Sequence, residues 1–128
     1  MVTKEKKIIL IIEDDEVILR ALYLLLHEKD FTIATATDGE TGQKMTERLK
    51  PDLVLLDLII PKISGFDYLK NIKANPDLKS TPVIVLSNLG DQENIDKAKS
   101  LGAEDYFVKS NTDLDKLSEK VKKTLDNL

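Results

Sequence analysis

An uninterrupted apolar run from Leu53 to Leu56 that stops at Asp57 is the feature that most constrains this chain. A run of strand length without alternating polar residues predicts a strand that is buried on both faces of a sheet. Pro61 and Gly65 predict a loop shortly after it. Because ligands of open parallel sheets bind beyond the carboxyl ends of the strands, the Asp57 carboxylate is a candidate reactive group.

Four other segments have the length and composition of strands. One of them alternates apolar and polar residues, which suits an edge of the sheet. The other three are largely apolar and are followed by a charged or hydroxyl side chain. The alternating segment is 31–36, and the others are 8–12 before Glu13 and Asp14, 83–86 before Ser87, and 106–108 before Lys109.

Helical patterns separate these strands and follow the last one, over 17–29, 40–49, 66–74, 92–101 and 113–125. The alternation of strands and helices predicts a doubly wound α/β domain, with a five-stranded parallel sheet and helices on both faces. The carboxyl ends of parallel strands share one edge, so the polar residues that follow them should gather there. These residues are Glu13, Asp14, Asp57, Ser87 and Lys109.

Length and composition narrow the possibilities further. The 128 residues fit one domain, expected to span 1–128, and no cysteine is present to form a disulfide or a thiolate metal site. The net charge of −4 argues against direct binding of nucleic acid, because such domains usually carry a basic face. The first apolar run, 8–12, is too short for a signal or membrane segment, so we expect no membrane contact and a cytoplasmic location.

Carboxylates gathered at one edge of a sheet repel one another, by roughly 3 kcal/mol per pair at about 5 Å in an effective dielectric of about 20. Either one acid is protonated, with a raised pKa, or a hard divalent cation offsets the charge. Oxygen ligands in an open site favour Mg²⁺, which is the ion expected here. Asp57 can then act as a nucleophile and form an acyl phosphate, while Ser87 and Lys109 bind phosphoryl oxygens.

Five stretches of the chain resemble the receiver domain of two-component response regulators. They are 11–15, 51–57, 61–65, 82–87 and 102–109, in the order of the family. The resemblance implies a sheet order of 2-1-3-4-5 and transfer of a phosphoryl group to Asp57 from a histidine kinase or phosphotransfer protein. It implies no enzymatic activity beyond the chain's own Mg²⁺-dependent phosphorylation and dephosphorylation. The output would be a changed surface at the fourth helix, the fifth strand and the last helix.

The same resemblance assigns roles to single residues. Ser87 would move toward the phosphoryl group, and Tyr106 would rotate inward behind it as the second part of a switch, although an ordinary packing role suits Tyr106 equally. Mg²⁺ would be held by two acids, by the acceptor and by the backbone carbonyl two residues after the acceptor. These ligands are Glu13, Asp14, Asp57 and, through its carbonyl, Ile59.

The acid pair has an alternative, since Asp14 and Asp15 are also adjacent acids. The pair Glu13 and Asp14 leaves the apolar face of the following helix directed inward, whereas the alternative pair shifts the register by one residue.

Two residues depart from the family pattern. Ser110 follows Lys109 where the family usually has a proline, often after a cis bond. Because a cis bond without proline costs about 3 kcal/mol, we expect a trans bond here. Asn88 replaces a small residue beside the phosphate pocket.

These departures motivate an alternative function, a pseudo-receiver that is not phosphorylated and acts as a protein-interaction module. A phosphatase is disfavoured because Ile59 stands where such enzymes have a second aspartate.

Partner surfaces can also be anticipated. The segment 17–26 contains only Arg20 as a charged residue, which is more apolar than a helix covering one sheet face requires. Its exposed part is expected to dock a kinase or phosphotransferase helix, the alternative being scattered surface leucines. The sequence shows no DNA-binding module, so we expect a stand-alone receiver or, alternatively, a part of a longer protein. Its output is expected to be a protein effector. It would act as a monomer or as a phosphorylation-dependent dimer.

Overall fold

The sheet has the predicted order. The computed structural model describes residues 6–27 and 31–128, and its five strands form one parallel sheet in the order β2-β1-β3-β4-β5. The predicted edge position of 31–36 is confirmed, because this segment is β2, the first strand in that order and thus an edge of the sheet. The strands are β1 (Lys7–Ile12), β2 (Phe31–Ala36), β3 (Leu53–Leu56), β4 (Val83–Ser87) and β5 (Asp105–Val108).

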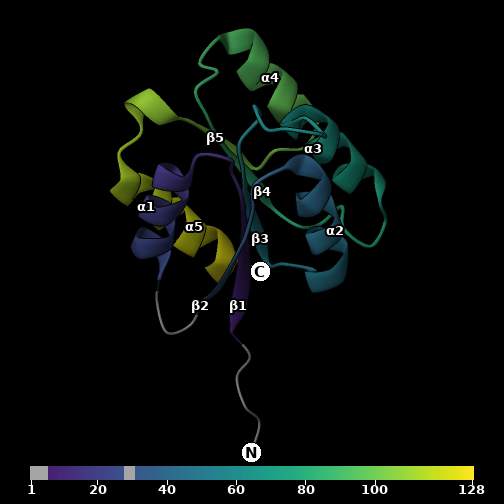
Figure 1. Ribbon diagram of the computed structural model, residues 1–128, viewed down its shortest axis with the longest axis horizontal. Coiled ribbons are helices and arrows are strands. Elements are labelled where there is room, and N and C mark those ends of the chain that lie inside the picture. Colours follow the sequence, from purple (N-terminus) through teal and green to yellow (C-terminus); the bar gives the residue numbers. More distant parts are fainter. Residues whose placement is uncertain (1–5, 28–30) are drawn as a thin grey trace, which may run out of the picture.

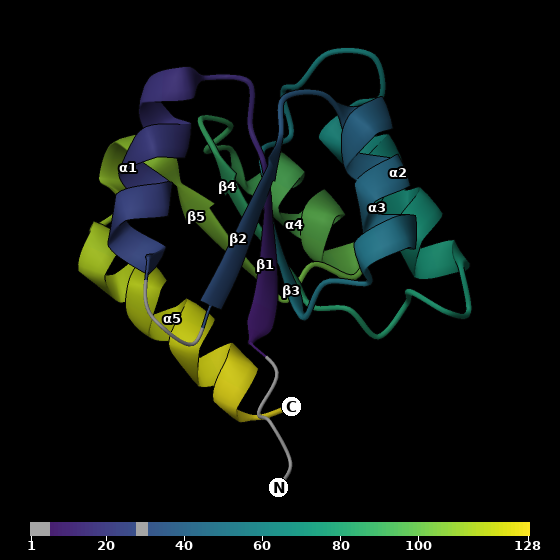
Figure 2. The same cartoon turned by 60° about the horizontal axis from the view of Figure 1, so that its bottom comes forward.

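Helices cover both faces of this sheet. Helices α1 and α5 lie on one face, and α2, α3 and α4 lie on the other (Figures 1 and 2). Among the residues described, no helix is both long and apolar enough to span a bilayer. The α-helices are α1 (Glu16–Leu26), α2 (Gly39–Leu49), α3 (Gly65–Ala74), α4 (Gln92–Ser100) and α5 (Leu114–Asp126), and a short 3-10 helix, η1 (Lys109–Asn111), was not predicted.

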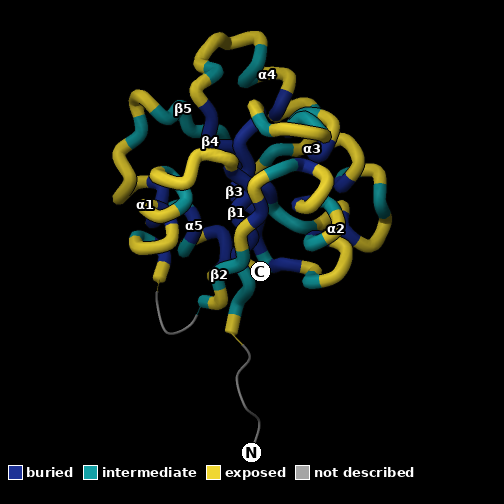
Figure 3. Tube along the Cα trace, in the orientation of Figure 1, coloured by how far each residue is buried: buried dark blue, intermediate teal, exposed yellow. Residues whose placement is uncertain are grey.

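The apolar strand runs are explained by burial on both faces. Residues 9–12 of β1 and 53–56 of β3 alternate between two clusters, and each of them is at most 1% exposed. Leu10, Ile12, Val54 and Leu56 pack toward α2, α3 and α4, whereas Ile9, Ile11, Leu53 and Leu55 pack toward α1 and α5. The central strands therefore form the dark, buried middle of the molecule in Figure 3. Each such side chain stabilises the fold by about 1.5–3 kcal/mol.

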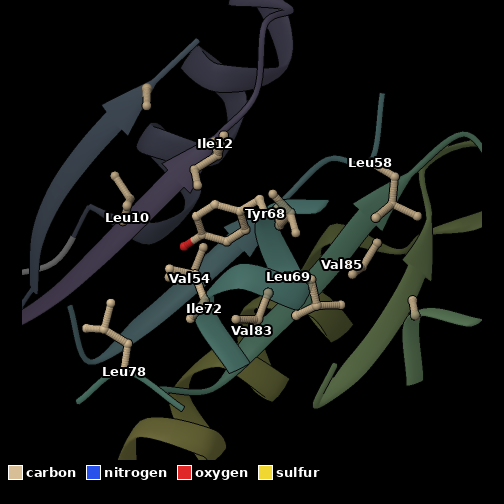
Figure 4. Close-up of a cluster of buried hydrophobic side chains, with 13 residues drawn as sticks. Leu10, Ile12, Val54, Leu58, Tyr68, Leu69, Ile72, Leu78, Val83 and Val85 are labelled. Atoms are coloured by element: carbon tan, nitrogen blue, oxygen red, sulfur yellow. The ribbon is translucent and has the colours of Figure 1, made fainter. Parts of the chain in front are cut away.

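A polar pair between α2 and α3 was not predicted. Tyr68 is fully buried in the cluster shown in Figure 4, and its hydroxyl lies 2.7 Å from Thr46 Oγ1. Thr46 Oγ1 donates in turn to the carbonyl of Gly42 at 2.7 Å, so Tyr68 is the donor of the pair. Met45 of α2 is half-buried and packs against the same cluster. The buried hydroxyls therefore have hydrogen-bond partners, as burial of polar groups requires.

Candidate functional site

The strand ends bring the predicted polar residues to one edge of the sheet, the upper end in Figure 2. The pairing of β1 with its neighbours continues one residue past its end: Glu13 N donates to Ala36 O at 2.9 Å, and Asp57 N donates to Ile12 O at 3.0 Å. These two acids and Ser87 are buried, with Glu13 2%, Asp57 6% and Ser87 0% exposed. Backbone pairing in the sheet thus holds carboxylates where side chains can meet across strands.

Three carboxylates form a cluster at this edge. Oxygens of Glu13, Asp14 and Asp57 all lie within 4.8 Å of one another. Asp15 has a different position, because its Oδ1 accepts hydrogen bonds from Val17 N at 2.9 Å and from Ile18 N at 3.4 Å. Asp15 therefore caps the amino end of α1. This geometry favours Glu13 and Asp14 as the acid pair over Asp14 and Asp15.

Lys109 reaches two of the acids from the end of β5. Its Nζ lies 2.9 Å from Asp57 Oδ2 and 2.5 Å from Glu13 Oε1, and its side chain is only 10% exposed. The approach to Asp57 was expected from the strand ends. The contact with Glu13 was missed because no pattern in the sequence shows which acid lies on the side of β5. The ammonium offsets part of the repulsion between the two carboxylates.

Burial and hydrogen bonding shift the pKa values of Glu13 and Asp57 in opposite directions. Burial, together with the hydrogen bond between its carboxyl group and Asp57, raises the pKa of Glu13 to about 8. Burial acts on Asp57 in the same sense, but the hydrogen bonds to Glu13, Lys109 and the Ile59 amide hold the pKa of Asp57 below its ordinary value. With a pKa of about 8, Glu13 is mostly protonated at neutral pH, whereas the lowered pKa of Asp57 keeps that acid ionised.

The donor set fits a hard divalent cation. Glu13 Oε2 is buried and has no hydrogen-bond partner in the described part of the chain, which is a costly state for a polar atom. Asp14, the third acid of the cluster, is exposed to solvent. An unpaired buried oxygen beside two further carboxylates matches the all-oxygen, partly open coordination that Mg²⁺ prefers.

The loop after β3 returns closely behind Asp57. Ile59 N donates to Asp57 Oδ1 at 3.2 Å, while the Ile59 side chain is 60% exposed. Gly65 N donates to Leu58 O at 3.0 Å. A Cβ at Gly65 would lie 2.5 Å from both Asp57 O and Leu58 Cα, so only glycine allows this approach. The use of the Ile59 carbonyl as a metal ligand stays a prediction.

Ser87 and Tyr106 hold the same loop residue. Ser87 Oγ accepts a hydrogen bond from Leu89 N at 3.3 Å, and the Tyr106 hydroxyl donates to Leu89 O at 2.5 Å. Tyr106 is half-buried against the core, and this burial raises its pKa. Asn88, between Ser87 and Leu89, is exposed. The two proposed switch residues are therefore connected through one backbone residue, a link that sequence reasoning did not find.

The turn after Lys109 has no cis bond. All peptide bonds between residues the structure describes are trans, which confirms the expectation for Lys109 and Ser110. The chain instead forms η1, and the hydroxyl of Thr112 donates to the carbonyl of Val108 at 2.5 Å. This side-chain bond ties the two ends of the turn that presents Lys109.

An apolar surface on α1 lies beside the site. Val17 is 78% and Leu24 69% exposed, as expected for a helix with apolar residues in excess. A groove of about 270 Å³ runs between α1 and the start of α5 and reaches Lys109. Leu114, the first residue of α5, is 42% exposed and lines this groove.

Known proteins share the sequence pattern and the fold. The family model described as response regulator receiver domain matches residues 9–122. The transcriptional regulatory protein AfsQ1 of Streptomyces coelicolor is 38% identical over 101 residues, which are 79% of this chain and 44% of the relative. The chain thus spans less than half the length of this curated relative.

Two solved structures are also similar. The Mn²⁺-bound form of response regulator Rcp1 is 30% identical, with a TM-score of 0.79 over 91% of this chain and 90% of that one. The phosphorylated cyanobacterial phytochrome response regulator RcpA is 31% identical, with a TM-score of 0.79 over 92% and 90% of the two chains.

Proposed function

The chain belongs to the response regulator receiver domain family, and from this membership we propose that Asp57 accepts a phosphoryl group from a histidine kinase or phosphotransfer protein. The observation that carries the proposal is the position of Asp57, which is 6% exposed, belongs to the acid cluster and contacts the Lys109 ammonium. The phosphorylated relative RcpA supports it. The chemistry is confined to the chain's own phosphorylation and dephosphorylation.

Asp57 is prepared to act as the nucleophile. Its lowered pKa keeps the carboxylate ionised at neutral pH, so it needs no separate base. In the transfer, a carboxylate oxygen forms a bond to phosphorus while the bond between phosphorus and the donor breaks, and the donor keeps that electron pair. Lys109 already contacts Asp57 Oδ2 and can follow the negative charge onto a phosphoryl oxygen. Ser87 would donate its hydroxyl to another phosphoryl oxygen.

Glu13, Asp14, Asp57 and the Ile59 carbonyl would hold Mg²⁺. When bound there, Mg²⁺ would supply positive charge to offset the negative charge that develops on the phosphoryl oxygens. The unpaired Glu13 Oε2 and the Mn²⁺-bound form of Rcp1 support this assignment. Because Glu13 carries a proton at neutral pH, it must release that proton before it can act as a ligand.

The output begins at Leu89. A Ser87 hydroxyl that turns to a phosphoryl oxygen leaves Leu89 N, and the loop before α4 then loses one of its two side-chain ties. A phosphoryl group adds nearly two negative charges, which is enough to shift such a loop. The surface of α4, β5 and α5 would change and contact a protein effector, with no direct binding of nucleic acid. The chain would work in the cytoplasm, as a monomer or a phosphorylation-dependent dimer.

The exposed face of α1 would receive the phosphoryl donor. Val17 and Leu24 offer apolar area, and the groove beside them reaches Lys109. A donor helix placed on this face would therefore bring its phosphoryl group close to Asp57.

The proposal is tested by incubating the protein with acetyl phosphate, with and without Mg²⁺, and measuring its intact mass. One phosphoryl adduct is expected with Mg²⁺ in the wild type and none in Asp57→Asn. The matched control is Asp15→Asn, since asparagine is an equally good helix cap and this residue lies outside the proposed ligand set. An adduct on Asp57→Asn would contradict the assignment of Asp57 as the phosphoryl acceptor. No adduct on the wild type, even with its cognate kinase, would favour the pseudo-receiver.

A further inference from the structure

A second charged site lies at the opposite end of the sheet from Asp57. A cavity of about 340 Å³ opens beside the amino ends of β4 and β5 and the carboxyl end of α5. The carboxyl end of α5 lies at the lower end of the molecule in Figure 2. Lysines from three segments converge on it, and Glu104 has the one acidic side chain among the described residues that line it. The lysines are Lys73 of α3, Lys79 of the following loop, and Lys120 and Lys123 of α5.

Lys73 is held in place rather than free in solvent. Its Nζ donates to Lys79 O at 3.0 Å and to Thr81 O at 2.6 Å. Its stem packs on Gly102, where an added Cβ would lie 3.0 Å from Lys73 Cγ. Burial lowers the pKa of Lys73, although the charge of Glu104 acts against this shift. The ammonium is thus fixed at the cavity before any ligand arrives, which reduces the entropy cost of binding.

The positive charge of this cavity is poorly compensated within the fold. Lys73, Lys79 and Lys123 form no ion pair with a residue that the structure describes. Lys120 lies 3.8 Å from Asp105, and both side chains are about one-third exposed, so this pair is weak. This concentration of charge occurs in a chain whose net charge is −4.

Helix stability explains only part of the arrangement. Lys73 and Lys123 stand in the last turns of α3 and α5, where a positive charge offsets the helix dipole. That role requires neither Lys79, which is in a loop, nor the convergence of both helix ends on one cavity.

We propose that this cavity binds an oligophosphate anion. Ammonium groups bind phosphoryl oxygens as point charges, and several of them around one cavity suit a chain of linked phosphoryl groups. The volume of about 340 Å³ falls in the range of small-ligand sites, about 300–1,000 Å³. No aromatic side chain of a described residue lines the cavity, so no platform for stacking a nucleobase is present. Among the described residues, Pro82 and Leu128 are the only apolar ones that line it, too few for a lipid tail or an amphipathic helix.

The test is a titration of the whole chain with inorganic triphosphate at constant ionic strength. Mg²⁺ is left out, so that triphosphate is not bound by the ion or drawn to the acid cluster. Amide chemical shifts locate the site, and calorimetry gives the dissociation constant. We expect saturable binding at one site, with the largest shifts at Lys79, Ser80 and Glu104, and weaker binding of orthophosphate.

Two double variants separate a site from general charge attraction. Lys79→Gln with Lys123→Gln should weaken triphosphate binding by at least about tenfold, the value of roughly one charge-assisted hydrogen bond. Lys44→Gln with Lys99→Gln removes the same charge from exposed positions of α2 and α4 and should leave the dissociation constant unchanged. Thermal unfolding of each variant verifies that it is folded.

Three results would overturn the proposal. These are an absence of saturable binding, an equal loss of affinity in both double variants, and shifts that gather at the Asp57 edge instead of the lysine cavity.

Discussion

The hydroxyl of Tyr106 donates a hydrogen bond to the backbone carbonyl of Leu89, the same residue whose N–H donates to Ser87. A residue in the middle of β5 is thereby connected to the loop that leads from Ser87, at the end of β4, into α4. The link is short and half-buried, so a movement of Ser87 or of Tyr106 changes how the Leu89 backbone is held.

Tyr106→Phe removes this hydrogen bond and keeps the packing of the ring. We expect the free energy of unfolding to fall by about 1 kcal/mol, measured by urea denaturation. The phosphoryl adduct on Asp57 should still form, because Tyr106 does not contact that carboxylate. The change in amide shifts on phosphorylation should shrink at Leu89 and along α4. A variant whose α4 responds as the wild type does would show that Tyr106 only packs.

Glu13 should make the Mg²⁺-free protein less stable as the pH rises. Its pKa increases from an ordinary 4.5 to about 8 on folding, so the folded state binds this proton more tightly than the unfolded state does. This contribution is complete below pH 4.5 and is lost as the pH rises from 4.5 to 8. The lowered pKa of Asp57 affects stability in a more acidic range. The contribution of Asp57 to the free energy of unfolding is lost only as the pH falls below 3.8, the ordinary pKa of this group.

The measurement is urea denaturation across this pH range, with Glu13→Gln as the comparison. Glutamine stays neutral and keeps nearly the same shape, so this variant should lose most of the decline in stability. Parallel pH profiles of the two proteins would exclude Glu13 as the titrating group.

Binding of Mg²⁺ should release close to one proton at pH 7, because a coordinating Glu13 must be ionised and its pKa is about 8 in the free protein. The affinity for Mg²⁺ should therefore rise with pH and level off above 8. Calorimetry in two buffers with different ionisation enthalpies counts the protons. In Glu13→Gln, binding should be weaker and free of this proton release. A pH-independent affinity of the wild type would mean that Glu13 is not a ligand.

Leu24→Glu should slow transfer from a phosphorylated donor protein while sparing transfer from acetyl phosphate. Leu24 is 69% exposed, so the substitution has little effect on folding. Loss of one apolar contact at a docking face corresponds to about a tenfold lower rate constant at low donor concentration. Gln92→Glu, at an exposed position of α4, adds the same charge and serves as the control. Equal rates for Leu24→Glu and wild type with the cognate donor would exclude docking through this face.

Much of the fold could be predicted from the apolar strand runs, because a strand that is buried on both faces of a sheet lacks alternating polar residues. In addition, parallel strands place their carboxyl ends at the same edge of the sheet. That alignment sufficed to predict that Asp57, Ser87 and Lys109 share an edge. The apolar face of α1 led to the prediction of Glu13 rather than Asp15 as a metal-binding acid, and the cap that Asp15 forms on α1 supports this prediction.

What could not be predicted depends on distances across the fold. The contact of Lys109 with Glu13, the buried hydroxyl pair of Tyr68 and Thr46, and the shared Leu89 link each join residues from different elements. No local periodicity encodes such contacts, because either partner alone is compatible with an exposed position.

The burial of β1 and β3 on both faces has an evolutionary consequence. The carboxylates of Glu13 and Asp57 follow buried strand residues that tolerate few substitutions, whereas α1 carries Val17 and Leu24 in solvent. Mutations can therefore accumulate on the outer helix faces without moving the reacting atoms. A duplicated copy of such a gene can acquire a new donor or a new target while it inherits the same chemistry intact.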